Sequence, residues 1–309
     1  MASHTASAPG KVILLGEHAV VYGKPALAMA IDLRFRCRIT PSQEMTLNSF
    51  PLDRAKHPYI SHILDNHWDG RPLSIETWSD IPSGSGLGSS AALCASMNAA
   101  VMASHGPYDE EVCALRSYHA ELGAQGSASP VDTSASVHGR GIAVNLGEGD
   151  ALWEVRQGDR RWKVSHLDVP SMTLVVGHTG VHAPTGPLVA KVRRYFQSSS
   201  FAKEIVNGIG DITVEAADRL RVGDKESLGR LMTENHKLLS ILGVSGRELD
   251  KLVQAALPHS YGAKLTGAGG GGSMIALTDE PGAVCEAIER RGGRPYIIRA
   301  DQPGAMIHD

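Results

Sequence analysis

The sequence predicts an α+β protein of two domains. Its 309 residues match the combined length of about two average domains. Up to residue 169 the pattern mixes strand-like segments with helices and loops, whereas residues 170–309 are mostly helical and end in a strand, a helix and a strand. We therefore divide the chain into an N-terminal domain, residues 1–169, and a C-terminal domain, residues 170–309.

The N-terminal domain opens with a small, polar stretch, Met1–Ser7, which we expect to be an unstructured leader or an added segment that is not part of the fold. Residues 12–15 form a short apolar run typical of a buried strand, and strict alternation over 34–39 and 73–78 predicts half-exposed strands. Further patterns predict helices at 58–68, 89–104, 109–123 and 132–137, and strands at 141–146 and 162–167 that flank a polar loop.

In the C-terminal domain, residues 172–177 are a candidate for a buried strand, and residues 261–272 are predicted to form a glycine-rich loop. Other patterns predict helices at 187–196, 201–220, 225–242, 245–257 and 281–291, and strands at 273–278 and 295–300. Helices therefore dominate this half of the chain, and a strand-helix-strand unit closes it.

Composition and charge exclude several classes of function. The formal net charge is −3, and the 30 basic and 33 acidic residues are interspersed, so we expect no nucleic-acid partner. The sequence has no run of about 18 apolar residues that could cross a bilayer, so we expect no membrane contact. The four cysteines form no CxxC pair and no histidine pair has zinc-ligand spacing, which favours free thiols in a reducing cytoplasm.

The run from Pro82 to Ser90 is the most informative part of the sequence. Its three glycines and four serines stand directly before an alanine-rich segment that is predicted to be helical. Glycines allow turns that aim several N–H groups at one point, and a helix N-terminus adds about half a positive charge there. We therefore expect a phosphate site. A flexible linker is the alternative, but a linker would not continue directly into a helix.

This loop differs from two familiar phosphate-binding motifs. It lacks the Gly-Lys-Ser/Thr ending of a Walker A loop. It also lacks the register and the ribose-binding acid of a dinucleotide-binding fingerprint. What remains is a wide anion cradle in which the hydroxyl groups of Ser85, Ser89 and Ser90 can reach phosphate oxygens or Mg²⁺.

Charged residues elsewhere suit phosphate chemistry. Lys11 precedes the apolar run 12–15 and Glu17 follows it, although both charges could simply face solvent. Glu121 closes a predicted helix, and Asp132 follows a Gly/Ser/Pro turn, where an aspartate commonly satisfies local N–H groups. Beside a phosphate cradle, one of these two carboxylates can ligate Mg²⁺ and the other can accept or orient a hydroxyl proton.

A second glycine-rich segment, Lys264–Ser273, contains four consecutive glycines at positions 269–272. Such a run lets the backbone approach a ligand closely, and it also makes a loop mobile. A hinge or a hairpin loop is the alternative interpretation of this segment.

Three segments together resemble the signature motifs of the GHMP small-molecule kinases. They are Pro9–Gly23, Pro82–Ala92 and Lys264–Ser273. They stand in the order of that family and at its usual separations, so the resemblance covers nearly the whole chain. One such motif would be weak evidence, whereas three in order are specific.

Within these kinases, the run Gly16–Gly23 is most similar to the mevalonate kinase family, whereas galactokinases typically continue Glu-His with Thr-Asp-Tyr. The setting of Glu121 and Asp132 and the segment 231–245 resemble the same family, in its compact archaeal or bacterial form. The resemblance implies ATP-dependent phosphorylation of the primary hydroxyl of (R)-mevalonate, a step of isoprenoid biosynthesis, with Mg²⁺ as cofactor.

The resemblance also implies roles for individual residues. Asp132 would act as the catalytic base or orient the hydroxyl, and Lys11 would keep it ionised and balance charge in the transition state. Ser90 and Glu121 would hold Mg²⁺ between the β- and γ-phosphates, with Ser89 as the alternative hydroxyl. The ATP phosphates would lie against Pro82, Gly84, Ser85, Gly86, Leu87, Gly88, Ser89, Ser90, Gly267, Gly269 and Gly270.

On the acceptor side, the resemblance implies contacts from Glu17, His18 and Thr185. Family members commonly carry Lys or Arg directly after that threonine, whereas this chain has Gly186. The candidates to replace the missing cation are Lys191, Arg193 and Arg194.

The resemblance further implies an N-terminal ribosomal-protein-like α/β domain and a ferredoxin-like C-terminal domain with extra helices, with the active site in the cleft between them. Mevalonate and ATP would be the small-molecule partners, and a homodimer is expected by analogy alone. Two alternatives stay open. The acceptor could be another one of the superfamily, such as phosphomevalonate or homoserine, or the chain could be a non-catalytic nucleotide or metabolite sensor.

Overall fold

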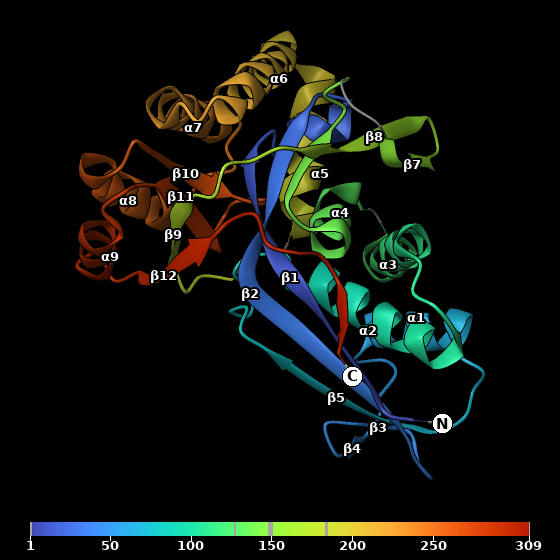
Figure 1. Cartoon of the computed structure of the whole chain (residues 1–309). Coiled ribbons are helices and arrows are strands. Elements are labelled where there is room, and N and C mark those ends of the chain that lie inside the picture. The colour runs from blue at the N-terminus through green and yellow to red at the C-terminus, as the bar shows by residue number, and fades with distance from the viewer. Residues whose placement is uncertain (1, 127, 148–150, 183–184, 309) are drawn as a thin grey trace.

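The structure, a computed structural model, describes residues 2–126, 128–147, 151–182 and 185–308. Two β-sheets with helices packed on them make up the molecule, and the two chain ends lie near each other beside the first sheet (Figure 1). Parts of four sequence predictions lie outside the described residues: Met1 of the leader, Ser127 of the Gly/Ser/Pro turn, residues 148–150 of the polar loop, and residues 183–184 before Thr185.

The first sheet has strands from both ends of the chain. In the described residues these strands are β1 (His4–Leu15), β2 (Ala26–Pro41), β3 (Thr46–Leu47), β4 (Phe50–Pro51), β5 (Leu73–Ser79), β6 (Gly141–Val144), β7 (Ala151–Gln157), β8 (Arg160–Leu167) and β13 (Met306–His308). β1 pairs along one edge of β2, while β5 and β6 share the other edge. β1 therefore lies between β2 and β13, and it is buried from Ala6 onward.

Helices from the same half of the chain pack on this sheet: α1 (Pro58–His67), α2 (Ser89–His105), α3 (Glu110–Gln125) and α4 (Pro130–His138). α2 and α4 contact β1 and β2, while α1 and α3 pack against α2 (Figure 1). α2 consists mainly of alanine and other small residues and is buried along most of its length, as expected for a central helix. It therefore places the loop before its first turn in the interior of the molecule.

The second sheet is antiparallel throughout. Its strands are β9 (Thr173–His178), β10 (Gly262–Thr266), β11 (Ser273–Leu277) and β12 (Arg294–Arg299), in the order β10-β11-β9-β12. The accompanying helices are α5 (Thr185–Ser198), α6 (Ser200–Arg221), α7 (Lys225–Ile241), α8 (Arg247–Ala256) and α9 (Pro281–Glu289). α8 and α9 pack on the sheet, whereas α6 pairs with α7, which contacts β10 (Figure 1). Short 3₁₀ helices are η1 (Ala19–Tyr22), between β1 and β2, and η2 (Leu257–His259).

The larger hydrophobic cluster contains residues from both predicted domains. It joins the first sheet and its helices to residues such as Leu174, Ile212 and Met232. A smaller cluster lies mainly among the second sheet and its helices. Because β13 also brings the last residues back to β1, packing and strand pairing both continue across the boundary at 169/170. The division into domains at that point stays a prediction.

Three sequence predictions about secondary structure are wrong. The expected leader is strand, because β1 begins at His4, and Ser7 within it is only 1% exposed. The expected polar loop contains β7, whose residues Trp153 and Val155 are buried. The expected loop 261–272 begins with β10. In each case a neighbouring strand supplies the ordering, which the local pattern does not contain.

Among the described residues, no helix combines the length and the apolar character that a membrane span needs. The predicted free thiols are confirmed, since all four cysteines are unpaired and Cys37, Cys94 and Cys113 are buried. Burial raises the pKa of Cys37 to about 12, so this thiol stays protonated and unreactive.

Candidate active site

A pocket of about 750 Å³ collects residues from both halves of the chain and from all three sequence motifs. Lys11 and Glu17 enter it from the first motif, the loop before α2 from the second, and Gly267 from the third. Glu121 and Asp132 line the same pocket from α3 and α4. Segments far apart in the sequence therefore converge on one volume large enough for two small molecules.

The loop before α2 has the geometry of an anion cradle. Gly84, Gly86 and Gly88 all have positive φ angles, of 68°, 76° and 78°, which a side chain would strain. Gly88 precedes the first turn of α2 and offers no side-chain cap. The first N–H groups of the helix therefore remain free to donate to a ligand. A Cβ at Gly88 would also lie 2.8 Å from Cγ of Lys11. The linker alternative is therefore excluded.

Most of the predicted phosphate-binding residues meet in the pocket. Those that line it are Gly84, Ser85, Gly86, Gly88, Ser89, Ser90 and Gly267, whereas Pro82, Leu87, Gly269 and Gly270 do not. Leu87 is buried, and its carbonyl accepts a hydrogen bond from the Lys11 N–H at 2.8 Å. Gly270 donates to the Val244 carbonyl at 2.7 Å, and a Cβ at Gly269 would lie 2.0 Å from the same oxygen. These two glycines let the loop pack against the α7–α8 turn.

Lys11 connects a carboxylate to the cradle. Its ammonium lies 3.2 Å from Oδ1 of Asp132 and donates to the Gly86 carbonyl at 3.0 Å. The Lys11 side chain is 2% exposed and that of Asp132 is 34% exposed. Lys11 therefore does not face solvent, and the Asp132 carboxylate is the member of the pair that a bound molecule can reach.

Glu121 lines the pocket, is buried, and has two hydroxyl partners. Ser90 Oγ donates to its Oε1 at 3.0 Å, and Thr133 Oγ1 donates to its Oε2 at 2.7 Å. Burial, together with the nearby charge of Asp132, raises the pKa of Glu121 to about 7, although these two hydrogen bonds and Lys11 act in the opposite direction. A nearby cation would lower this pKa again. Ser90, rather than Ser89, is the hydroxyl in contact with this carboxylate.

These oxygen donors fit a divalent cation that takes most of its ligands from a nucleotide. Among the described residues, no cluster of three or more His, Cys, Asp or Glu side chains could hold a metal by itself. Mg²⁺ commonly uses only one or two protein ligands and fills its other positions with phosphate oxygens and water. The pair of Ser90 and Glu121, next to the cradle, meets that description.

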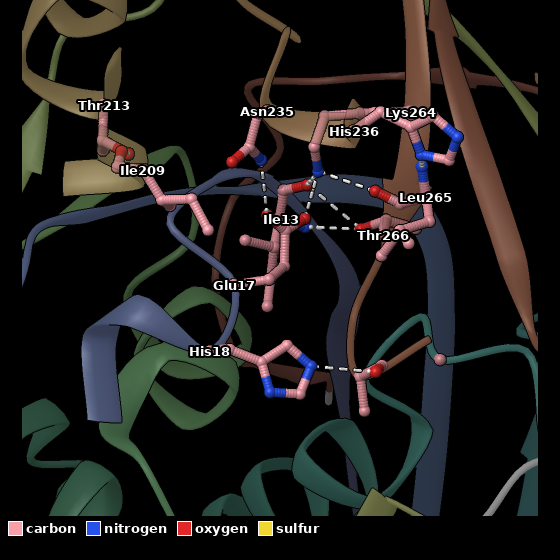
Figure 2. A network of polar contacts seen from close by, with 12 residues as sticks. Ile13, Glu17, His18, Ile209, Thr213, Asn235, His236, Lys264, Leu265 and Thr266 are labelled. Atoms are coloured by element: carbon pink, nitrogen blue, oxygen red, sulfur yellow. Dashed lines mark hydrogen bonds and ion pairs between the residues drawn. The ribbon is translucent and has the colours of Figure 1, made fainter. Parts of the chain in front are cut away.

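The turn after β1 presents His18 to the pocket. His18 has a φ of 61°, an uncommon conformation for a residue with a side chain. Its Nε2 lies 2.9 Å from the Ala268 carbonyl, which can only accept, so Nε2 carries the proton. Burial lowers the pKa of His18, so the ring is neutral near pH 7 and its Nδ1 is an acceptor. Figure 2 shows the His18 ring below Glu17, with a dashed line that marks this hydrogen bond.

Glu17 is buried rather than solvent-facing, at 1% exposure. Its Oε1 forms an ion pair with Lys264, and its Oε2 accepts a hydrogen bond from Nδ2 of Asn235 at 3.0 Å (Figure 2). The family resemblance implied that Glu17 contacts the acceptor, and it assigned no function to Lys264 or Asn235.

The start of α5 forms another wall of the pocket, where Thr185 and Gly186 both line it. Of the three candidates for the missing cation, Lys191 donates to the Gly243 carbonyl at 2.6 Å and Arg194 is exposed away from the lining. Arg193 does line the pocket, and its buried Nε has no hydrogen-bond partner among the described residues.

Arg160 also lines the pocket. The sequence pattern did not indicate it, because the residues of β7 and the start of β8 were predicted to form a loop. Burial raises the pKa of Tyr22, and the nearby positive charges of Arg193 and Arg160 counteract that rise. Tyr22 ends η1, which follows directly on Glu17 and His18. The two arginines therefore gather on the side of the pocket that the first motif forms.

Comparison with known proteins agrees with this geometry. The family model described as GHMP kinases N terminal domain matches residues 57–140, and that described as GHMP kinases C terminal matches residues 214–294. The mevalonate kinase of Methanothermobacter thermautotrophicus is 36% identical over 309 aligned residues, which cover 96% of this chain and 97% of that protein.

Solved structures of the same family share the fold. The crystal structure of L. major mevalonate kinase in complex with R-mevalonate superposes with a TM-score of 0.80 at 26% identity, covering 96% of this chain and 95% of that one. The Methanococcus jannaschii mevalonate kinase gives a TM-score of 0.77 at 28% identity, with 96% and 98% coverage. The predicted α+β fold of the GHMP kinases is thereby confirmed, and the chain belongs to the mevalonate kinase family of GHMP kinases.

Proposed function

We propose that the chain transfers the γ-phosphoryl group of ATP to the primary hydroxyl of (R)-mevalonate and releases 5-phosphomevalonate and ADP. The observation that carries this proposal is the Lys11–Asp132 pair, which lies beside the glycine cradle in one pocket. A carboxylate next to an anion site suits the transfer of a phosphoryl group to an alcohol, because that reaction depends mainly on positioning and on charge stabilisation.

In the reaction, the hydroxyl oxygen of the acceptor forms a bond to the γ-phosphorus while the bond between that phosphorus and the β–γ bridging oxygen breaks. Asp132 accepts the hydroxyl proton. Lys11, which contacts both Asp132 and the Gly86 carbonyl, balances the negative charge of the transition state. The free N–H groups at the start of α2 stabilise the phosphate oxygens. Mg²⁺, held by Ser90 and Glu121 when it is bound, would neutralise charge on the β- and γ-phosphates.

On the acceptor side, His18 and Thr185 provide polar contacts for the acceptor, and Arg160 and Arg193 provide positive charge. Among the residues that the structure describes, neither arginine forms an ion pair with a carboxylate of the pocket. Mevalonate itself carries a carboxylate. We assign the two guanidinium groups to that carboxylate, because Arg donors match its planar shape. They would replace the cation that Gly186 cannot supply.

The homodimer and the cytoplasmic location belong to the proposal as well. The homodimer is supported by analogy with the family alone. The cytoplasmic location is supported by the four free cysteines, since a reducing compartment keeps thiols unpaired.

The proposal is tested by a coupled ADP-release assay with mevalonate, phosphomevalonate, homoserine and galactose. We expect turnover with mevalonate and little with the other three. Turnover with phosphomevalonate or homoserine but none with mevalonate would transfer the activity to another GHMP acceptor. ATP binding without turnover of any acceptor would favour the non-catalytic sensor.

Replacing Arg193 with glutamine should raise the KM for mevalonate by about 10- to 100-fold, because a hydrogen bond to a charged group contributes about 1.5–3 kcal/mol. The KM for ATP should stay nearly constant, since Arg193 lies on the acceptor wall. Arg194→Gln is the matched control, because Arg194 is the next residue on α5 and does not line the pocket. Steady-state kinetics with both substrates varied measure the effect, and equal KM values in the two variants would contradict it.

A further inference from the structure

Lys264 is the most deeply buried charged residue near the pocket that the proposed reaction does not use. It lies in β10 with 0% exposure, and its ammonium forms an ion pair with Oε1 of Glu17. The same ammonium donates to the Leu265 carbonyl at 2.6 Å and lies 3.5 Å from the Ile13 carbonyl. Figure 2 shows Lys264 reaching from β10 toward Ile13 and Glu17.

The partners of this ammonium belong to different parts of the fold. Ile13 lies in β1 and Glu17 follows that strand, whereas Lys264 lies in the second sheet. Thr266, two residues further along β10, also contacts β1. Its hydroxyl accepts a hydrogen bond from the Ile13 N–H at 2.9 Å and donates one to the Ile13 carbonyl at 3.1 Å. On α7, Asn235 donates to the other oxygen of Glu17. Lys264 and Glu17 therefore join the two sheets at the pocket.

The energetics of this ion pair argue for a role other than stability alone. Burial lowers the pKa of Lys264, the charge of Glu17 counteracts that shift, and Lys11 adds to it. A buried ion pair contributes little more to stability than two apolar side chains of similar size, because both charges lose their water. Such a pair does hold its two side chains in one orientation, because a buried charge is stable only while its partner stays in contact with it. Both oxygens of Glu17 are committed in this way to protein donors.

What the pair orients is the turn that carries His18. Glu17 anchors one side of this turn to Lys264, and His18, held at a positive φ, anchors the other side to the Ala268 carbonyl. Lys264 lies in β10, and Ala268 lies two residues after the end of this strand, in the glycine loop. The acceptor-facing turn and the glycine loop are therefore held to each other at two points.

We propose that Lys264 is a positioning residue, which acts through Glu17 to hold His18 and the acceptor hydroxyl in line with Asp132. Glu17 then serves the acceptor through the turn that it holds, rather than through direct contact. This inference rests on the proposed function, because it assumes a hydroxyl acceptor bound beside His18.

The test compares Lys264→Met with the neutral double variant Glu17→Gln/Lys264→Met. In both, we expect kcat/KM for mevalonate to fall by on the order of 10²-fold, the effect of displacing a reacting group by about 1 Å. The Kd for ATP, measured by calorimetry, should stay within about threefold of wild type, which is less than one kcal/mol. Lys225→Met is the matched control, because Lys225 pairs with Asp279 at 2.6 Å on the surface and should leave the kinetics unchanged.

The double variant separates positioning from folding. If Lys264→Met fails to fold because Glu17 is left buried without a partner, the neutral double variant should recover the thermal midpoint while kcat/KM stays low. Wild-type kinetics in either folded variant would overturn the proposal. If the wild-type protein turns over no acceptor, the proposed function fails, and hydrogen exchange over residues 16–22 still tests positioning: faster exchange in the double variant supports it, and unchanged exchange contradicts it.

Discussion

Replacing Asp132 with asparagine should lower kcat by about 10²–10⁴-fold, the usual contribution of a general base. Asparagine keeps the shape of the side chain but can neither take the hydroxyl proton nor balance the Lys11 ammonium, which lies 3.2 Å from the carboxylate. ATP binding should change little, because the cradle is built from backbone groups of the loop before α2 rather than from Asp132.

The measurement combines ADP release under saturating substrates with calorimetric binding of ATP. Asp279→Asn is the control, since Asp279 is an exposed carboxylate with its own lysine partner, outside the pocket. Asp279→Asn should leave kcat unchanged. This control measures the effect of losing a surface ion pair alone. A kcat within about threefold of wild type in Asp132→Asn would be far below the range expected for a base and would remove Asp132 from the mechanism.

The features of the candidate site that the sequence indicates most directly are those whose geometry is local. Gly84, Gly86 and Gly88 sit directly before a helix, and their positive φ angles follow from the tight turns that only glycine adopts easily. The first turn of α2 and its free N–H groups follow from the same short run. The same run contains Ser90, and the structure places its hydroxyl in contact with Glu121.

The parts that the sequence could not predict depend on partners far along the chain. Lys264 and Glu17 are 247 positions apart, and neither neighbourhood indicates that the two charges meet. Residues near His4 read as a leader because their order comes from pairing with β13 and β2, not from an apolar pattern. Arg160 was hidden in the same way, since β7 and β8 order each other as a hairpin. Such features follow from tertiary pairing rather than local propensity.

Glu121 should make ATP binding depend on Mg²⁺ and on pH together. Burial and the charge of Asp132 raise the pKa of Glu121 to about 7, so the carboxyl is mostly protonated at pH 6 and mostly ionised at pH 8. A metal ligand must be deprotonated, so a proton competes with Mg²⁺ for this group. Below pH 7 each pH unit should weaken the contribution of Mg²⁺ to ATP affinity by up to about tenfold.

Glu121→Gln removes both the charge and the titration while keeping the hydrogen-bonding shape. Its Kd for ATP with Mg²⁺ at pH 8 should rise by at least about tenfold, the low end of what a group supporting a metal site contributes. The Kd with the chelator EDTA in place of Mg²⁺ should change less. Glu111→Gln is the matched control, because Glu111 is exposed in the first turn of the same helix.

The decisive comparison is the Mg²⁺-dependent gain in ATP affinity at pH 6 and pH 8, in wild type and in Glu121→Gln. The titration of ATP itself is common to both proteins, so the difference between them isolates Glu121. In wild type the gain should be larger at pH 8 than at pH 6, because only the ionised carboxylate attracts the cation. In Glu121→Gln only the smaller pH dependence that comes from ATP itself should remain. An equal pH dependence of the gain in the two proteins would mean that Glu121 does not contact the metal, and Asp132, whose carboxylate a bound molecule can reach, would then be the candidate acidic ligand.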